Sequence, residues 1–562
     1  MPKTTAFSRS TTRLIVIGVY LILSAIWCSH FFSFNDLGSH ILQDGDGALN
    51  AWALNWVSRA LTSDWSNLFN GNAFYPHSNS IALSEHMVGL AIFNIPVQLF
   101  TNNPWVGYNL LIFSAYFFSA LGGYFFIQTL TNNHLAAFWG GIFWGFCFFR
   151  IHHFGHLQIL SYQWFPFIAA FLIKTRLEPT IKNALFLTVF FVIQALTSWY
   201  LAVIAACLVI ILFLNYLTAT KWTLKHTALF GLSGILVLAA NLPFALPYMH
   251  ALTQSSLIDR LGSATMLGDQ VKAWDFFAPP QASFFGSLIP DNKYLIWQEN
   301  TLFIGYVPCL LSLIGLMMGW RSNKRLVVSG LSLIILGYLL AMGYVASGWN
   351  LHLPLYYLSS GLPFIAAIRA TQRFALLVYF GILILSGLGA HYLFKRRHVQ
   401  TGLIICSLLS IAFLIEVYPY QLPWKEIPPY TASRLDTAIA TKQTHQRSPL
   451  IVLHYPIYTS KPGYPVAESK YMVDSTLHWA KILNGFSGAE PLGFHNDMLT
   501  LNTLPSQDAF DLLKKYQVNL LAIHKDLEQN QKDAIKSFFQ DAEDGSAIEE
   551  LGDDEYLVLL KR

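Results

Sequence analysis

The sequence predicts a polytopic helical membrane bundle, mainly α, that carries a small α/β domain at its C-terminal end. Hydrophobic residues make up 54% of the 562 residues, whereas Asp, Glu, Lys and Arg together make up only 12%. Soluble proteins have roughly 25% charged residues, so this chain could not cover a water-facing surface along its whole length. Residues 1–420 carry 21 Lys and Arg against 12 Asp and Glu, whereas residues 421–562 carry 14 against 19. We therefore expect a transmembrane domain at 1–420 and a water-exposed domain at 421–562.

Apolar stretches long enough to cross a bilayer predict about 11 spans. The first stretch follows three basic residues and has no signal-peptide cleavage site, so we expect it to remain as a span. The spans are predicted near residues 14–34, 105–130, 135–150, 155–173, 183–200, 201–217, 227–248, 302–320, 326–346, 374–394 and 401–420.

The positive-inside rule gives these spans an orientation. With the N-terminus in the cytoplasm, the inner segments hold most basic residues of the membrane part, and Glu178 is the only acid among them. This orientation requires the apolar segment 87–100 to lie at the outer interface without crossing. It places loop 35–104, loop 249–301 and the acidic tail together on the outer side.

Three short apolar runs in the tail, at 450–453, 518–523 and 556–560, predict β-strands. Helical patterns at 507–516 and 529–540 alternate with them. Such alternation of strands and helices is typical of an α/β domain.

Acidic residues stand directly after the first span, in the predicted outer loop 35–104. Asp44 and Asp46 flank a glycine there, and Glu85 with His86 follows later in the same loop. Carboxylates at a membrane surface are costly beside apolar neighbours unless they have a role. Asp-Gly pairs are also ordinary turn residues, so a solvated turn is the alternative.

Residues 47–62 show an amphipathic helical pattern in which Trp52 and Trp56 lie on one face. Tryptophan is enriched at membrane–water interfaces. The pattern therefore predicts an interfacial helix that lies flat on the outer leaflet and holds Asp44 and Asp46 close to the lipid headgroups.

A second polar cluster combines Arg150 with His152, His153 and His156 in a predicted tight outer turn. Arg remains charged and grips phosphate with two parallel hydrogen bonds, so the cluster predicts an anion site. Snorkelling of these side chains at the end of a span is the alternative. The histidines could also bind a metal, but no neighbouring carboxylate or cysteine completes a known ligand spacing, so we predict no metal site.

A third cluster consists of Arg369 and Arg373, just before a predicted span. Their i,i+4 spacing places both guanidinium groups on one helical face. Two such cations predict a phosphate ligand, and pairing with Asp275 or Glu299 is the alternative.

The order of these features resembles the GT-C class of membrane glycosyltransferases, which use sugars carried on a polyprenyl phosphate. The chain looks like an uncharacterised bacterial branch of that class, related in layout to the membrane proteins that glycosylate teichoic acids and lipid A. The tail has no WWD-type sequence, so N-glycosylation of proteins is not implied. The motifs that carry the resemblance are Asp44-Gly-Asp46, Trp52-Ala-Leu-Asn-Trp56, Phe74-Tyr-Pro-His77, Ser84-Glu85-His86, His156-Leu-Gln158, Gln163-Trp164-Phe-Pro166, Asn484-Gly485 and Leu504-Pro-Ser506.

The resemblance implies an inverting transfer in which a first-loop aspartate, Asp46 in preference to Asp44, is the base for an acceptor hydroxyl. Glu85 or His86 would position the acceptor or orient the base. Fixed cations and hydrogen-bond donors would stabilise the departing polyprenyl phosphate, and the candidates are Arg150, His153, His156, Arg369 and Arg373.

The implied partners are a lipid-linked sugar donor, whose lipid tail would lie among the aromatic-rich spans, and a glycan or lipid acceptor. No cofactor is required, although Asp44, Asp46 and Glu85 leave a divalent metal possible. The implied location is a bacterial inner membrane with the tail outside. No basic run is long enough to predict nucleic-acid binding.

Two other classes of function remain open. A transporter or flippase of a lipid-linked or anionic substrate would explain the many spans, but transporters usually place ionisable groups near the middle of the bilayer. Here the polar clusters gather at one face. A non-catalytic envelope scaffold would depend on the tail and not on Asp46.

Overall fold

The computed structural model of the chain is described over residues 9–39, 45–153, 155–256, 271–289, 300–346, 351–361, 368, 370–395, 397–419, 431–446, 448–459, 464–541, 546–552 and 554–561. The chain divides into two compact units. The helical unit comprises Met1–His30, Ile112–Leu242 and Arg260–Pro423. The mixed unit comprises Phe31–Leu111, Pro243–Asp259 and Trp424–Arg562, so it contains the whole predicted first outer loop, 35–104, together with the tail from Trp424 onward.

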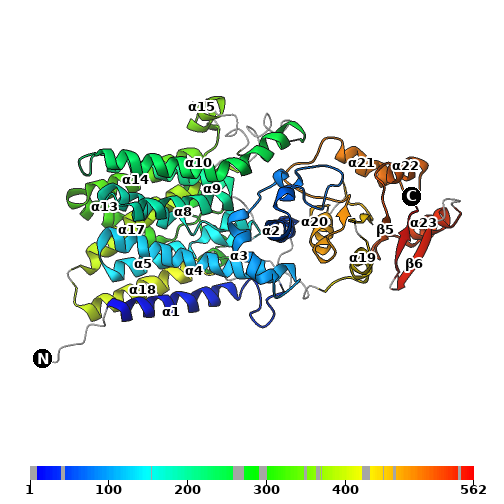
Figure 1. The fold of residues 1–562 in the computed structure, drawn as a ribbon. Helices are drawn as coiled ribbons and strands as arrows, with labels where there is room; N and C mark the ends of the chain where they lie inside the picture. The colour runs from blue at the N-terminus through cyan, green and yellow to red at the C-terminus, as the bar shows by residue number, and fades with distance from the viewer. Residues whose placement is uncertain are drawn as a thin grey trace. The chain divides into compact units, whose positions relative to one another are not determined.

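Long apolar helices run side by side in the helical unit (Figure 1). They are α1 (Arg9–Cys28), α4 (Pro104–Thr131), α5 (His134–Phe146), α7 (Phe165–Leu177), α8 (Ile181–Thr197), α9 (Trp199–Tyr216), α10 (Leu224–Thr253), α13 (Tyr306–Ser322), α14 (Lys324–Ala341), α17 (Ala375–Phe394) and α18 (Val399–Glu416). The first turns of α4, up to Leu111, and the last turns of α10, from Pro243, belong to the mixed unit. Shorter elements connect them: η3 (Phe148–His153), α6 (Leu157–Leu160), η4 (Ala273–Phe276), α12 (Phe284–Ser287), β1 (Val345–Ala346), β2 (Leu351–His352), α15 (Pro354–Gly361) and η5 (Thr371–Phe374).

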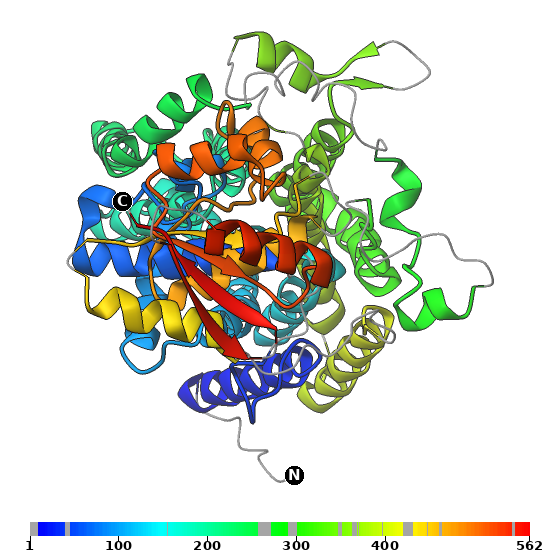
Figure 2. The same cartoon turned by 90° about the vertical axis from the view of Figure 1, so that its right-hand side faces the viewer.

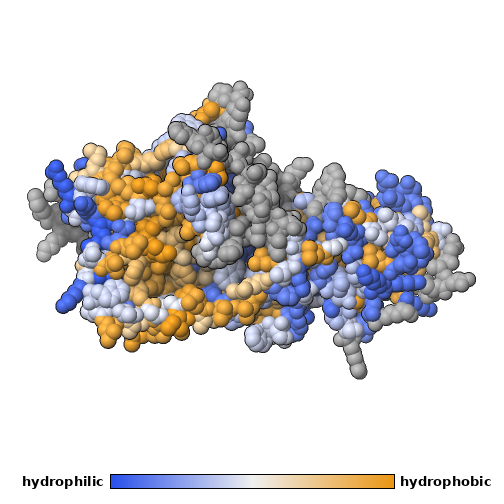
Figure 3. Space-filling view, turned by 90° about the horizontal axis from the view of Figure 1, so that it is seen from above, coloured by the Kyte–Doolittle hydropathy of each residue, from blue (hydrophilic) through white to orange (hydrophobic). Residues whose placement is uncertain are grey.

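Eight helical stretches among the described residues are long and apolar enough to cross a membrane. Three further predicted spans correspond to the shorter helices α7, α8 and α13. Hydrophobic residues cover much of the visible surface of this unit (Figure 3). The chain is a multi-pass membrane protein, and the predicted helical bundle is confirmed, whereas the total of about 11 crossings stays a prediction.

Helix α17 lies at the centre of the helical unit, where α5, α13 and α14 pack against it. Glycines let two of these backbones touch. A Cβ on Gly389 of α17 would lie 1.9 Å from the carbonyl oxygen of Leu311, and one on Gly315 of α13 would lie 2.0 Å from that of Leu385. Small residues at such crossings are how helices associate closely within a membrane.

A five-stranded sheet forms the centre of the tail, with the strand order β4-β3-β5-β7-β6. Strand β3 pairs in parallel with β4 and β5, whereas β7 is antiparallel to β5 and β6. The β6–β7 hairpin and the helix that packs on β6 are seen in Figure 2. The strands are β3 (Ile451–Tyr455), β4 (Lys481–Ile482), β5 (Leu520–Ile523), β6 (Ala547–Gly552) and β7 (Glu555–Leu559).

The small α/β domain is confirmed, and its predicted strands are β3, β5 and β7. The helices of the tail are α19 (Arg434–Thr444), α20 (Tyr464–Asp474), η6 (Ser475–Leu477), α21 (Phe494–Leu501), α22 (Gln507–Lys515) and α23 (Gln529–Asp541). Of these, α22 and α23 match the two predicted helical patterns. Strands β4 and β6 were not predicted.

The first-loop segment of the mixed unit is also helical, with α2 (Gly45–Ser63), η1 (Trp65–Asn67), η2 (Ser80–Leu83) and α3 (Val88–Gln98). Helix α2 packs against α20 of the tail and against α3. Helix α3 has 11 residues, about 17 Å of helix, which is too short to cross a hydrocarbon core of about 30 Å. This length agrees with the requirement that segment 87–100 does not cross.

Candidate active site

Asp46 lies in the first turn of α2, and its side chain is partly exposed. A carboxylate at a helix N-terminus is stabilised by the helix dipole. The preceding Gly45 faces the tail, because a Cβ there would lie 2.5 Å from the carbonyl oxygen of Pro465. Gly45, the glycine between Asp44 and Asp46, therefore permits close packing of α2 on α20. This packing determines the position of Asp46 in the mixed unit. Asp44 lies outside the described residues.

The expectation that both tryptophans of α2 face lipid is wrong. Trp52 is 1% exposed, and its Nε1 donates a hydrogen bond of 2.8 Å to Oδ1 of Asn72. The Nε1 of Trp56 donates to the carbonyl oxygen of Leu68, and its ring packs against Trp479 of the tail. The apolar face of α2 is covered by protein, so the helix is an internal element of the mixed unit.

The first loop is joined to the tail by backbone pairing along β4. The N–H of Phe74 donates to the carbonyl oxygen of Asn484 at 3.1 Å, and that of Tyr75 donates to Ile482 at 3.0 Å. A Cβ on Gly485 would lie 2.6 Å from the Phe74 ring, which explains the glycine of the Asn484-Gly485 motif. The loop that carries the acids is therefore part of the same folded layer as the tail.

Tyr248 holds the Ser84-Glu85-His86 segment in place. Its hydroxyl donates to the carbonyl oxygen of Ser84 at 2.8 Å and accepts the N–H of His86 at 2.9 Å. These bonds position Glu85, whose side chain is half-buried. No sequence signal marked Tyr248, which lies far from this segment in the chain.

His86 has a structural role in the described geometry. Its ring is 1% exposed, and Nδ1 accepts the N–H of Val88 at the start of α3. Burial lowers its pKa to about 3, so the imidazole is neutral at physiological pH. The ring packs against Phe244 and Tyr248, so the prediction that His86 positions the acceptor or orients the base is not supported.

Arg150 is enclosed in the helical unit, contrary to its predicted role as a phosphate ligand. The side chain is 0% exposed, Nη1 donates to the carbonyl oxygen of Leu160 at 2.7 Å, and Nη2 donates to Oγ of Ser119 at 2.6 Å. Its guanidinium carbon lies 3.8 Å from the centroid of the Tyr162 ring. Arg150 therefore ties together the turn between α5 and α7.

His153 and His156 lie near each other, with ring centroids 6.2 Å apart. Nδ1 of His153 donates to the carbonyl oxygen of Phe149 at 2.8 Å. In the neutral ring this leaves Nε2 as an acceptor, so His153 would donate to a phosphate only as an imidazolium. His156 is partly exposed, whereas the side chain of His152 lies outside the described set.

Arg373 is 9% exposed, and its guanidinium carbon lies 4.9 Å from the centroid of the Tyr200 ring. The Tyr200 hydroxyl also accepts the N–H of Ala370 at 3.4 Å, a contact that the sequence did not predict. Arg369 lies outside the described residues. The helix begins at Thr371, and Ala370 has φ −85° and ψ 74°. The predicted shared face of the two arginines depends on Arg369 and stays a prediction.

The candidate residues thus divide between the two units. Asp46, Glu85 and His86 belong to the mixed unit, whereas Arg150, His153, His156 and Arg373 belong to the helical unit.

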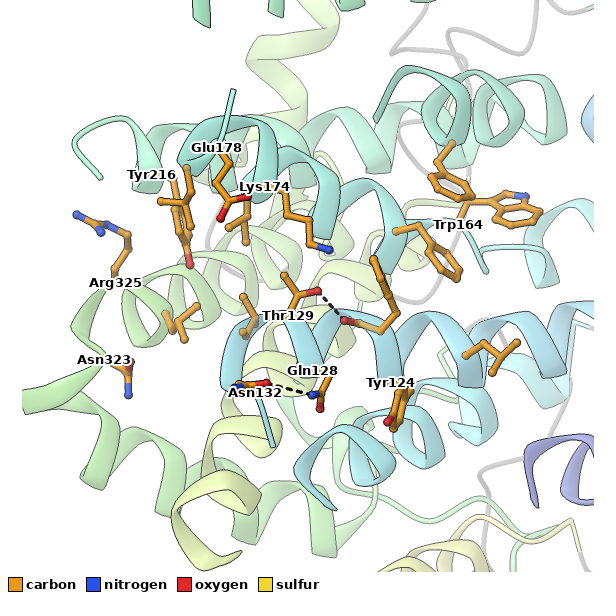
Figure 4. Close-up of a pocket in the computed structure, with 18 of the residues that line it drawn as sticks. Tyr124, Gln128, Thr129, Asn132, Trp164, Lys174, Glu178, Tyr216, Asn323 and Arg325 are labelled. Carbon is orange, nitrogen blue, oxygen red and sulfur yellow. Dashed lines mark hydrogen bonds between the residues drawn. The ribbon is translucent and has the colours of Figure 1, made fainter. Parts of the chain in front are cut away.

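The helical unit also contains a groove of about 1270 Å³. Figure 4 shows Trp164 at one end and Arg325 with Asn323 at the other. Aromatic residues form much of its wall, and its cations are Arg13, Lys174, Lys324 and Arg325. Lys174 lies 4.4 Å from the centroid of the Phe125 ring. The aromatic part of its wall suits a lipid chain, whereas its cations belong to segments that the sequence predicts on the cytoplasmic side.

Comparisons with known proteins show the fold. No family model and no curated protein matches the chain. The archaeal oligosaccharyltransferase AglB from Archaeoglobus fulgidus, solved with an inhibitory peptide and a dolichol-phosphate, superposes with a TM-score of 0.51 at 9% identity, over 95% of this chain and 72% of that one. The arabinofuranosyltransferase AftD from Mycobacteria superposes with a TM-score of 0.55 at 12% identity, over 99% of this chain and 40% of that one. The chain has a GT-C-type fold.

A third structure, ArnT from Cupriavidus metallidurans in the apo state, aligns over 98% of each chain at 10% identity. Its TM-score of 0.38 is too low to show a shared fold. The GT-C resemblance seen in the sequence motifs is therefore confirmed at the level of fold. At these identities the comparisons do not extend to substrate.

Proposed function

We propose that this GT-C-fold protein is a membrane glycosyltransferase that moves a sugar from a polyprenyl-phosphate donor to an acceptor hydroxyl, with inversion. The observation that carries the proposal is the position of Asp46, a partly exposed carboxylate at the start of a helix that is otherwise largely buried. Packing against α20 and the Trp52–Asn72 hydrogen bond restrict the motion of that helix. Such restriction is what a positioned general base requires.

In the proposed reaction Asp46 takes the proton of the acceptor hydroxyl. The oxygen attacks the anomeric carbon from the face opposite the phosphate, and the bond from that carbon to the phosphate oxygen breaks. Polyprenyl phosphate leaves with the electron pair, and the sugar passes through an oxocarbenium-like transition state. Glu85, held by Tyr248, is proposed to accept a hydrogen bond from the acceptor.

Arg373 and Arg369, with His156, are proposed to stabilise the charge that develops on the departing phosphate. Arg150 is not part of this proposal, because its guanidinium is enclosed and bound by protein groups. The aromatic groove of the helical unit is proposed to hold the donor's lipid chain. The dolichol-phosphate in the AglB structure supports a donor of this chemical kind.

The proposed location is a bacterial inner membrane, with the mixed unit on the outer side. The function can be tested by mass spectrometry of extracted envelope lipids and polysaccharides from cells with and without the protein. We expect the deletion strain to lack one sugar substituent and to accumulate the lipid-linked donor of that sugar. An unchanged glycan profile, with altered transport of a lipid-linked precursor into vesicles that contain the purified protein, would favour a flippase instead.

A further inference from the structure

A buried cluster in the tail brings together three side chains that are far apart in the sequence. Asp436 stands in the first turn of α19, His454 lies in β3, and His478 follows η6 just before β4. One ligand atom from each lies within 4.8 Å of the others, and Nε2 of His478 lies 3.6 Å from Oδ1 of Asp436. Their exposed fractions are 0%, 0% and 4%.

Each of these side chains has one polar atom occupied by a neighbour. Oδ2 of Asp436 accepts the hydroxyl of Ser433, and Nδ1 of His454 lies 2.9 Å from Nε2 of His524. Nδ1 of His478 accepts the N–H of Ala480 at 3.0 Å.

The other polar atom of each side chain has no hydrogen-bond partner among the described residues: Oδ1 of Asp436, Nε2 of His454 and Nε2 of His478. A buried polar atom left without a partner costs about 1–3 kcal/mol. Nε2 of His478 and Oδ1 of Asp436 face each other at 3.6 Å, and a ring nitrogen of His454 lies within 4.8 Å of their ligand atoms, which indicates a shared ligand.

We propose that Asp436, His454 and His478 bind one divalent transition-metal ion of the Zn²⁺ type. Imidazole and carboxylate are ligands that zinc accepts at about 2.0–2.2 Å, which places neighbouring ligand atoms of a tetrahedral site roughly 3.3–3.5 Å apart. The 3.6 Å between His478 and Asp436 is close to that spacing. A water molecule completes the four-coordinate shell.

The contacts around the cluster suit a metal site, with one adjustment. His454 bound through Nε2 carries its proton on Nδ1 and donates it to His524, the usual arrangement for a metal-binding histidine. For His478 to bind through Nε2, its proton must move to Nδ1, and the hydrogen bond from Ala480 is then lost. Asp436 and His454 are therefore the primary ligands, and His478 is the weakest of the three.

The role of the ion is structural, because the site is buried and joins α19, β3 and the segment before β4. That segment is where the first loop is held: Nδ2 of Asn72 donates to Oγ of Ser475 and to the carbonyl oxygen of Ala480, on both sides of His478. The ion would thus fix the surface on which the loop of Asp46 rests. This inference does not depend on the proposed glycosyl transfer.

The test uses the full-length protein in detergent, stripped with a chelator, loaded with Zn²⁺ or Co²⁺ and desalted before metal analysis. We expect one equivalent of metal per chain in the wild type, and loss of that equivalent in Asp436→Asn and His454→Gln. His478→Gln should bind at least about tenfold more weakly. The matched control is His445→Gln, an exposed histidine at the end of the same helix, because surface histidines also adsorb metal.

Two further readouts keep the inference testable if a variant fails to fold. The wild-type Co²⁺ form should show the intense visible absorption of four-coordinate nitrogen and oxygen ligation, without thiolate charge transfer. Chelation should speed hydrogen exchange at 475–482 and 72–75. A folded wild type that retains no stoichiometric metal, or equal metal retention in Asp436→Asn and His445→Gln, would overturn the site and leave an ordered water as the ligand.

Discussion

The indole nitrogen of Trp52 donates a hydrogen bond of 2.8 Å to Oδ1 of Asn72, and both residues are buried. Asn72 in turn donates to Ser475 and Ala480 of the tail. A continuous buried network therefore links the helix of the proposed base to a segment about 400 residues later in the chain. The tail acts as a support for the first loop.

Replacing Asn72 with Ala should detach this support. The substitution leaves the Trp52 N–H and the Ala480 carbonyl without their partner, whereas the Ser475 hydroxyl keeps its bond to Met472, so we expect a loss of about 2–4 kcal/mol in the free energy of unfolding. Thermal unfolding followed by tryptophan fluorescence, together with limited proteolysis of the tail, measures the effect. The control is Asn67→Ala, whose exposed amide is hydrogen-bonded to Asp64 and Asn70. Equal destabilisation by both variants would contradict the network.

Tyr248→Phe should lower transfer as well as stability. Phe keeps the ring packing against Phe69 and His86 but removes both hydrogen bonds to the Ser84–His86 segment. Each bond contributes about 0.5–1.5 kcal/mol to stability, so the loss of both should cost about 1–3 kcal/mol, and the misplacement of Glu85 should lower the turnover rate. Tyr516→Phe, which loses only a hydroxyl bound to Asp497, is the control. A change in thermal stability without a change in turnover would contradict the positioning role.

Glu468 should give the mixed unit a pH-dependent stability. Burial raises its pKa to about 7, from an ordinary value of 4.5, although Tyr458 N–H and Asn484 donate to it. The folded state therefore holds the Glu468 proton more tightly than the unfolded state does. The resulting contribution to the free energy of unfolding is fully present below pH 4.5 and is lost as the pH rises through 7. The free energy of unfolding of Glu468→Gln minus that of the wild type should therefore increase by up to about 3 kcal/mol as the pH rises from 5 to 8. Paired melting curves at the two pH values measure this, and a pH-independent difference would contradict it.

The proposed orientation predicts which sites a membrane-impermeant thiol reagent reaches. Lys525→Cys lies on an exposed loop of the mixed unit and should be labelled in intact cells, or in spheroplasts where an outer membrane is present. Lys221→Cys, in an exposed turn between α9 and α10, should be labelled only after the inner membrane is permeabilised. The wild type, whose five cysteines are buried or half-buried, gives the background. Labelling of both positions from the same side would contradict the orientation.

Sequence periodicity predicted the spans and the longer tail strands because each is a local run of apolar residues. It did not predict which neighbour covers an apolar face. The pattern around Trp52 was interpreted as facing lipid, but helix α20, far along the chain, covers it. Strand β4 has only two residues, too few for any alternation to be seen.

Single polar residues were harder to interpret than patterns. Asp436, His454 and His478 have no informative spacing, and only the α/β fold of the tail brings them together. Arg150 was interpreted as a ligand from its neighbours in sequence, whereas Leu160 and Ser119 occupy its guanidinium. The spacing of Arg369 and Arg373 was interpreted as helical, whereas Arg373 lies in a short helix that begins at Thr371.

The most direct test of the proposed function compares Asp46→Asn with Asp64→Asn in cells that lack the native protein, at equal abundance in the membrane. Asp64 is an exposed aspartate just beyond the end of α2, bound to Ser66 and Asn67. Loss of a general base lowers rates by about 10²–10⁴-fold. Mass spectrometry of the envelope glycans should therefore show the sugar substituent restored by Asp64→Asn and absent with Asp46→Asn. Full restoration by Asp46→Asn would contradict the assignment of Asp46 as the base.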